Sequence, residues 1–231
     1  MSQEVRRKYH QELSSLEADV VAMGERAELA VHRAVESLAR RDEVLGRSVI
    51  DDDDDLDGRY LDIERRIVDL FALQTPVASD LRLVLAILHV NMHLERIGDM
   101  AVNIAKIGLA TKDLPAGETI VAHLEEMAEV VERMIRVAIR AFVDRDLELC
   151  LQLPEMDDPV DLLNRGMYSE VISLGADPNT LEWGIRMNVV ARQLERVGDH
   201  AVDIGEQVGF LLTGEFREFT DASHAVEMPP A

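Results

Sequence analysis

The five-residue phrase ERIGD, which starts at Glu95, returns as ERVGD, which starts at Glu195. The two starts lie 195 − 95 = 100 residues apart in a chain of 231 residues. A repeat at this spacing predicts two related structural units of about 100 residues each, rather than a single large unit.

Further matching positions extend the repeat over most of the chain. At an offset of 100, the first-half positions Leu81, Val90, Leu94, Glu95, Gly98, Asp99, Val102 and Ile104 match Leu181, Val190, Leu194, Glu195, Gly198, Asp199, Val202 and Ile204. At an offset of 104, Met23, Glu28, Ala34, Asp42, Asp53 and Asp57 match Met127, Glu132, Ala138, Asp146, Asp157 and Asp161. The second half has therefore lost about one helical turn between its second and third elements.

Apolar residues recur at helical spacing through most of the chain, which predicts an all-α fold. We expect six helices, over residues 5–40, 42–73, 79–110, 118–143, 146–173 and 177–214. Asp42, Ser79 and Asp177 are the expected N-caps, and Pro154 and Pro159 are expected to kink the fifth helix. The expected architecture is two tandem three-helix bundles, residues 1–112 and 113–214, followed by a flexible tail, residues 215–231.

Charge and composition exclude several classes of function. The chain has 45 Asp and Glu against 24 Lys and Arg, a net charge of −21, which disfavours binding to nucleic acid. The single cysteine, Cys150, allows no internal disulfide and no cysteine zinc site. The sequence shows neither a signal peptide nor a span of about 20 apolar residues. We therefore expect a cytoplasmic protein with no direct membrane insertion.

The repeated acids interrupt an apolar helix face. Glu95 and Asp99 lie about 40° apart around a helix axis, on the row that also carries Leu88 and Met92. A carboxylate on such a face must be neutralised by a proton, an arginine or a metal ion. Gly98 lies beside the pair, and its cost of about 1 kcal/mol relative to Ala indicates a close approach by a neighbouring group.

A second acidic row lies on the preceding helix of each half. Asp53, Asp57 and Glu64 fall within about 40° of one another, and Asp157 and Asp161 repeat the first two of them. If the two helices of each half are neighbours, each half brings two carboxylate pairs together. Such a set of oxygens suits hard cations and can bridge more than one ion.

An ordinary ion-pair network is the alternative interpretation. Arg96 can pair with Asp99 three residues later, and Arg196 also follows its glutamate. The acidic run 51–55 is typical of a solvated surface. The histidines His89, His93 and His200 are not expected to join the acids on a metal, since His93 lies about 200° from Glu95.

Four stretches together resemble the PhoU family of phosphate-signalling regulators. They are AMGERAE (22–28), LQTPVASDLR (73–82), ERIGD and ERVGD. The resemblance covers nearly the whole chain and implies two similar three-helix bundles, each with bound metal ions of iron, manganese, magnesium or zinc. The implied ligands are the motif acids Glu95, Asp99, Glu195 and Asp199, with Asp53, Asp57, Asp157 and Asp161 facing them. Further ligands or residues that support the ligands are expected among Asn103, Asp203, Glu64, Glu28 and Glu132, and Asn103 replaces the acid that Asp203 supplies in the second half.

The resemblance also implies partners. They are the ATPase subunit of the phosphate ABC transporter and the sensor histidine kinase of the phosphate two-component system, both reached from the cytoplasm at the inner face of the membrane. It further implies a homodimer and a negative regulatory role when phosphate is plentiful.

Three functions are compatible with these residues. The first is a metal-loaded adaptor that performs no catalysis. The second is a carboxylate-bridged metal-dependent phosphoesterase, but no histidine has a Glu three residues before it and the dipeptide Gly-Lys is absent, which argues against a ferritin-like di-iron centre and a Walker phosphate loop. The third is a metal-free helical scaffold.

Overall fold

The computed structural model describes residues 3–74 and 76–219, and these residues form six α-helices and no strand. The helices are α1 (Gln3–Arg40), α2 (Glu43–Leu73), α3 (Ser79–Thr111), α4 (Glu118–Asp144), α5 (Leu147–Ser173) and α6 (Pro178–Thr213). The predicted all-α fold and its six helices are confirmed.

Aspartates are the N-cap residues of three of the helices. The side chain of Asp42 accepts a hydrogen bond from the backbone N–H of Leu45, 3.0 Å away, at the start of α2. Asp177 does the same with Thr180 at the start of α6, where Pro178 occupies the first turn. Gly214 ends α6 with a φ of 79°, in the left-handed region that favours glycine. These caps satisfy backbone groups that a helix end leaves unpaired.

The start of α3 differs from the prediction. Ser79 is the first helical residue rather than the N-cap, and Ala78 precedes it with a φ of 49° and no side-chain cap. The expected break at Thr75-Pro76 includes Thr75, which lies outside the described residues. In the second half, α5 continues as one helix through Pro154 and Pro159.

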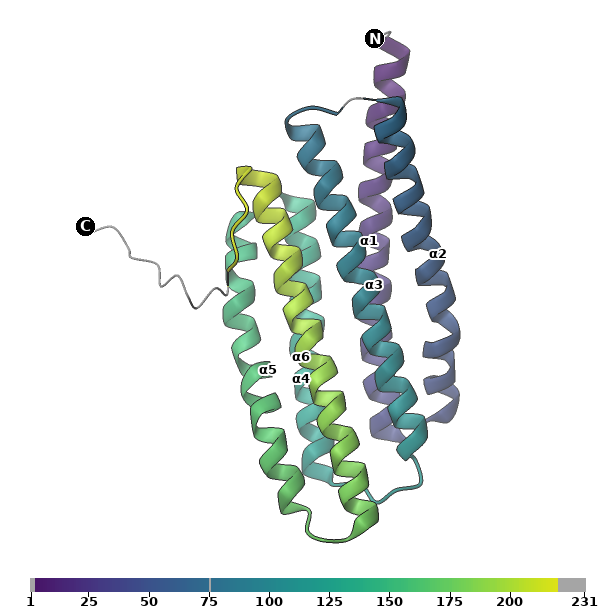
Figure 1. Ribbon diagram of the computed structural model, residues 1–231, viewed down its shortest axis with the longest axis vertical. Coiled ribbons are helices and arrows are strands. Elements are labelled where there is room, and N and C mark those ends of the chain that lie inside the picture. The colour runs from purple at the N-terminus through teal and green to yellow at the C-terminus, as the bar shows by residue number, and fades with distance from the viewer. Residues whose placement is uncertain (1–2, 75, 220–231) are drawn as a thin grey trace, which may run out of the picture.

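The helices form two three-helix bundles that lie side by side (Figure 1). Helices α1, α2 and α3 pack against one another, and so do α4, α5 and α6. The bundles meet through α1 against α4 and α3 against α6, so that α2 and α5 lie at the outer flanks. The two predicted bundles are confirmed.

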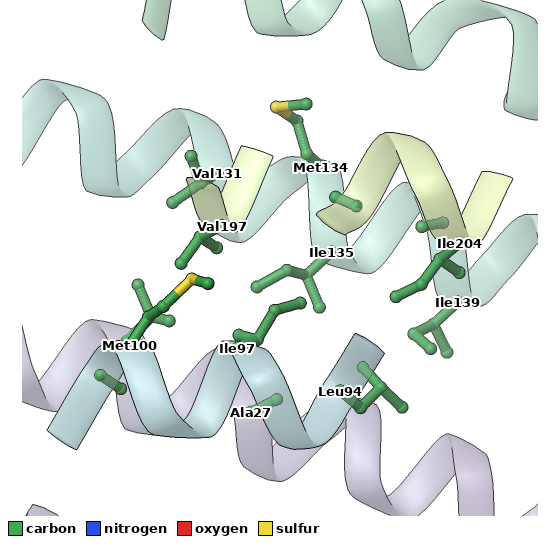
Figure 2. Close-up of a cluster of buried hydrophobic side chains, with 14 of the residues drawn as sticks. Ala27, Leu94, Ile97, Met100, Val131, Met134, Ile135, Ile139, Val197 and Ile204 are labelled. Carbon is green, nitrogen blue, oxygen red and sulfur yellow. The ribbon is translucent and has the colours of Figure 1, made fainter. Parts of the chain in front are cut away.

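One continuous apolar core runs through both bundles. Figure 2 shows Ile97 of α3, Ile135 of α4 and Val197 of α6 among the buried side chains where the bundles meet. The helices approach closely here: a Cβ atom added to Gly24 of α1 would lie 2.6 Å from a side-chain carbon of Ile139 on α4. Burial of this shared surface holds the two halves in one arrangement.

The first residues after α6 pack against the second bundle. The backbone N–H of Phe219 donates to Glu206 at 2.6 Å, and the ring of Phe216 stacks on that of Phe210 with centroids 3.9 Å apart. Residues 220–231 of the expected tail lie outside the described residues. Within the described ranges, no helix has the length and apolar character needed to cross a membrane.

Candidate functional site

The contact between α2 and α3 carries the first acidic cluster, made of Asp53, Asp57, Glu95 and Asp99. The pKa of Asp53 is raised to about 6, first by burial and then by the charges of Asp57 and Asp99. The pKa of Glu95 is raised by burial first and then by Asp99, with Asp57 and Asp53 adding to the effect. The four predicted acids therefore lie close enough to repel one another.

Two cations reduce the repulsion in the first acidic cluster. Arg96 lies 3.2 Å from a carboxylate oxygen of Asp99 and 3.4 Å from one of Glu95. Lys106 lowers the pKa of Asp53, against the effect of the neighbouring acids. The Arg96–Asp99 pair expected from the ion-pair interpretation is thus present, although the Arg96 side chain is 54% exposed and such surface pairs are weak.

The contact between α5 and α6 carries the second acidic cluster, made of Asp157, Asp161, Glu195 and Asp199. Asp157 is 9% exposed and Glu195 is 7% exposed, so two of the four acids are buried. The pKa of Asp157 is raised to about 7, first by burial and then by Asp199, Asp161 and Glu195. The pKa of Glu195 is raised as well, first by burial and then by Asp199. Burial therefore makes this cluster the more costly one to ionise.

Arginines neutralise only part of the second acidic cluster. Arg192 contacts one oxygen of Glu195, and Arg165 lies 2.9 Å from Asp161. Within the described part of the chain, Oδ1 of Asp157 and Oε2 of Glu195 are buried and have no hydrogen-bond partner. Buried carboxylate oxygens without partners are costly, which indicates a place for a cation or for a proton.

The two motif glycines explain how the facing helices come so close. A Cβ atom on Gly98 would lie 3.1 Å from a side-chain carbon of Leu56 and 3.5 Å from Oδ1 of Asp53. A Cβ atom on Gly198 would lie 2.2 Å from Oδ1 of Asp157. The close approach predicted at Gly98 is confirmed, and at Gly198 the group that approaches is the acid itself.

Three acids of the wider predicted set lie away from the acidic clusters or have other partners. Glu64 accepts a hydrogen bond from the hydroxyl of Tyr60 at 2.8 Å. Glu28 and Glu132 lie on the α1–α4 seam, where Glu28 pairs with Arg136 and Glu132 lies 3.2 Å from Nδ1 of His32. Asn103, which also belongs to the wider predicted set, is exposed.

Asp203, also in the wider set, lies beside two histidines. His93 of α3 and His200 of α6 place their Nδ1 atoms 3.0 Å apart, and Oδ2 of Asp203 lies 3.5 Å from the first and 3.4 Å from the second. His93 lies at the contact between α3 and α6, whereas Glu95 faces α2. This agrees with the expectation that His93 does not join Glu95. His93 and His200 lie beside each other across the two bundles, which the sequence analysis did not predict. Sequence spacing alone gives no such signal.

The spacing of ligand atoms differs between these groups. Among the described residues, His93, His200 and Asp203 are the one set of three or more His, Cys, Asp and Glu whose ligand atoms all lie within 4.8 Å of one another. No three acids of either acidic cluster have oxygens that all lie this close to one another, as expected for like charges that repel. The donor type in both acidic clusters nevertheless fits hard cations, and the two buried oxygens without partners give such an ion a place in the second cluster.

Comparison with known proteins shows which family the chain belongs to. A family model described as a PhoU domain matches the chain twice, over residues 20–108 and 124–208, one match in each bundle. The chain belongs to the PhoU family. The phosphate-specific transport system accessory protein PhoU homolog of Caulobacter vibrioides (strain NA1000 / CB15N) is 35% identical over 216 residues, which cover 93% of this chain and 94% of that protein. The PhoU homolog of Clostridium acetobutylicum is 30% identical over 220 residues, which cover 94% of this chain and 99% of that protein.

Solved PhoU structures have the same fold. The crystal structure of PhoU from Pseudomonas aeruginosa matches with a TM-score of 0.83 and 31% identity, over 90% of this chain and 100% of that one. The phosphate transport system regulatory protein PhoU from Streptococcus pneumoniae matches with a TM-score of 0.83 and 27% identity, over 90% of this chain and 99% of that one. The PhoU resemblance read from the repeated motifs is confirmed.

Proposed function

We propose that this chain is a metal-binding regulator of phosphate uptake and of phosphate-starvation signalling. It acts in the cytoplasm as a negative-regulatory adaptor between the ATPase subunit of the phosphate ABC transporter and a sensor histidine kinase, and reaches the inner face of the membrane through these partners. The relatives' names support the link to phosphate transport, since they describe accessory proteins of a phosphate-specific transport system. The proposal assigns no catalytic step to the chain and includes the homodimer that the family resemblance implies.

One observation supports the metal-binding part of the proposal: the duplicated acids face one another between α2 and α3 and between α5 and α6, close enough to raise one another's pKa values. Asp53, Asp57, Glu95 and Asp99 would hold cations in the first half, and Asp157, Asp161, Glu195 and Asp199 in the second. The pKa values of Asp53 and Asp157 are raised, first by burial and then by the neighbouring acids, so full ionisation of each set is costly. A bound divalent cation would supply the missing positive charge and let the acids ionise together.

The position of the acidic clusters suits an adaptor. Each cluster lies between an outer helix and its neighbour, α2 and α3 in the first bundle and α5 and α6 in the second. A cation that crosslinks α2 to α3, or α5 to α6, would stiffen an outer surface without repacking the core. Metal loading would thereby set the shape and charge of the surfaces that partners contact.

Pull-down with the transporter ATPase and with the kinase tests the proposal. We expect the wild-type chain, loaded with Mn²⁺, to bind both partners. A four-site variant, with Glu95 and Glu195 changed to Gln and Asp99 and Asp199 changed to Asn, is expected to lose most of this binding and its bound manganese.

A charge-matched variant controls for the change in net charge. It carries the same kinds of substitution at four exposed acids outside the clusters, Glu25, Asp51, Glu125 and Glu155, and is expected to bind both partners as the wild type does. Unchanged partner binding by the four-site variant would contradict the metal-dependent adaptor. Equal metal content in the wild type and the four-site variant would favour the metal-free scaffold instead.

A further inference from the structure

A second kind of polar cluster lies on the seam between the bundles, apart from the acidic clusters. His93 comes from α3 in the first bundle, whereas His200 and Asp203 come from successive turns of α6 in the second. His93 is 8% exposed, and the side chains of His200 and Asp203 are 19% and 43% exposed. The set therefore extends from the interior of the seam to its surface.

The three ligand atoms form a triangle of the size that a tetrahedral metal ion requires. Its sides are 3.0 Å between the two Nδ1 atoms, and 3.5 Å and 3.4 Å from these to Oδ2 of Asp203. A tetrahedral ion with metal–ligand distances of about 2.0–2.2 Å places its ligand atoms about 3.3–3.6 Å apart. The side chains thus need only small movements to bind a common ion.

The chemistry of the donors selects a different class of metal from the acidic clusters. Imidazole nitrogen suits zinc and its neighbours among the transition metals, whereas all-oxygen sets suit magnesium, calcium and manganese. A histidine binds a metal ion through a deprotonated ring nitrogen. The Nδ1 atoms of His93 and His200 both face Oδ2 of Asp203, so the three donor atoms converge on one point.

We propose that His93, His200 and Asp203 bind one divalent transition metal ion of the zinc type, which crosslinks the two bundles across the α3–α6 seam. Three protein ligands leave a fourth position for water or another small ligand, as in open zinc sites. The partly exposed side chain of Asp203 marks the side from which the ion enters.

The sequence repeat limits the chain to one such site. At an offset of 100 residues, the positions equivalent to His93, His200 and Asp203 hold Gln193, Met100 and Asn103. These three side chains offer neither an imidazole nor a carboxylate. The inference therefore differs from the proposed function in its stoichiometry, one ion per chain, as well as in its metal.

Zinc titration of the full chain tests the site. Protein stripped with a chelator is saturated with Mg²⁺ to occupy the acidic clusters, then titrated with Zn²⁺, desalted and analysed for bound metal. We expect the wild type to retain about one zinc per chain, and a His93→Asn/His200→Asn variant to retain none. The matched control is His32→Asn, which removes a histidine that also faces a carboxylate across the two bundles, Glu132, but has no second histidine beside it. It is expected to retain the zinc.

Two further measurements keep the proposal falsifiable if the double variant does not fold. Asp203→Asn changes only the most exposed ligand and is expected to weaken zinc binding at least about tenfold. Substitution of Co²⁺ into the wild type is expected to give the visible absorption of a four-coordinate ion with nitrogen ligands. Equal zinc retention in wild type and both ligand variants, or Co²⁺ spectra of a six-coordinate ion with oxygen ligands, would overturn the proposal.

The four-site acidic variant separates this inference from the proposed function. With Glu95, Asp99, Glu195 and Asp199 neutral, it is expected to lose manganese and partner binding but to keep the zinc and the Co²⁺ spectrum. Loss of the zinc together with the manganese would show that the zinc was bound by the acidic clusters, and would overturn the seam site alone.

Discussion

The two acidic clusters repeat the same residues but differ in their electrostatics. In the first, Asp53 has a pKa raised to about 6 and has Lys106 nearby. In the second, Asp157 has a pKa raised to about 7, and the position equivalent to Lys106 holds Glu206. A duplicated motif thus keeps its ligand types while burial and neighbouring charges change, and the second cluster has more to gain from a cation.

The difference originates in packing. Gly198 allows Oδ1 of Asp157 to lie where a Cβ atom would otherwise be, whereas Gly98 is covered mainly by the apolar side chain of Leu56. Asp157 of α5 is therefore buried against α6, while Asp53 of α2 stays partly exposed. Each of the following changes tests whether this asymmetry is real.

The largest effect is expected from Asp157→Asn in metal-free protein. In the unfolded chain Asp157 ionises near its ordinary pKa of 3.8, and in the folded chain near 7. The free energy of unfolding of the wild type should therefore fall as the pH rises from about 4 to about 7, whereas the variant lacks this loss. At pH 8 the variant should be more stable by about 2–4 kcal/mol, and at pH 4 nearly unchanged.

Urea unfolding with chelator present measures this effect. Asp158→Asn, at the exposed neighbouring position, is the control and should show little change. Asp53→Asn should give a gain of the same sign but smaller, because Asp53 is more exposed and its pKa is raised less. Equal gains in the free energy of unfolding for Asp53→Asn and Asp157→Asn would contradict the difference between the two clusters.

Addition of metal should favour the wild type over these two variants. At a free Mn²⁺ concentration about 100 times the dissociation constant, binding stabilises the wild type by about 2.7 kcal/mol per site. Asp157→Asn should lose the contribution of the second acidic cluster and keep that of the first, and Asp53→Asn should do the opposite. Thermal unfolding with and without Mn²⁺ shows the difference, and full metal stabilisation of both variants would argue that these acids bind no ion.

Alanine at the two motif glycines should separate the clusters by packing alone. Ala is favoured over Gly in a helix by about 1 kcal/mol, but at Gly198 its Cβ atom would require the Asp157 carboxylate to move. We expect Gly198→Ala to destabilise the metal-free chain by about 1–2 kcal/mol, and Gly98→Ala to be within about 1 kcal/mol of neutral. Denaturant midpoints test this order, and a larger loss at Gly98 would contradict it.

The smallest effects are expected from the arginines. Arg192→Gln leaves the buried Glu195 without its cation, whereas Arg96→Gln removes an exposed pair with Asp99. We expect losses of about 1 kcal/mol for the first and less than about 0.5 kcal/mol for the second, in metal-free protein at pH 7. A larger loss at Arg96, read from urea unfolding, would show that the first acidic cluster depends on its arginine more than the geometry indicates.

Most of the fold could be predicted from the sequence because its signals are local. The helical period, the caps at Asp42 and Asp177 and the hundred-residue repeat each depend on residues near one another in the chain or on direct comparison of its halves. The predicted N-cap at Ser79 was wrong, because Ser79 is the first helical residue and Ala78 is the N-cap. The pairing of α2 with α3 acids followed from the shared helix faces.

The other features of the candidate sites depend on how the helices and bundles pack against one another, which no local sequence pattern encodes. His93 and His200 are 107 residues apart and belong to different bundles, so only the packing of α3 on α6 shows that their rings are adjacent. The depth of Asp157 was equally hidden, since Asp53 and Asp157 occupy equivalent positions of the repeat. Burial, rather than residue type, separates these two acids.

The most direct test of cation binding by the duplicated acids is a crystal of the chain grown with Mn²⁺, with diffraction recorded at the manganese edge. The account predicts anomalous peaks among Asp157, Asp161, Glu195 and Asp199, and among Asp53, Asp57, Glu95 and Asp99, with fuller occupancy in the second cluster. Maps in which Arg96, Arg165 and Arg192 hold these carboxylates, with no anomalous signal between them, would contradict it.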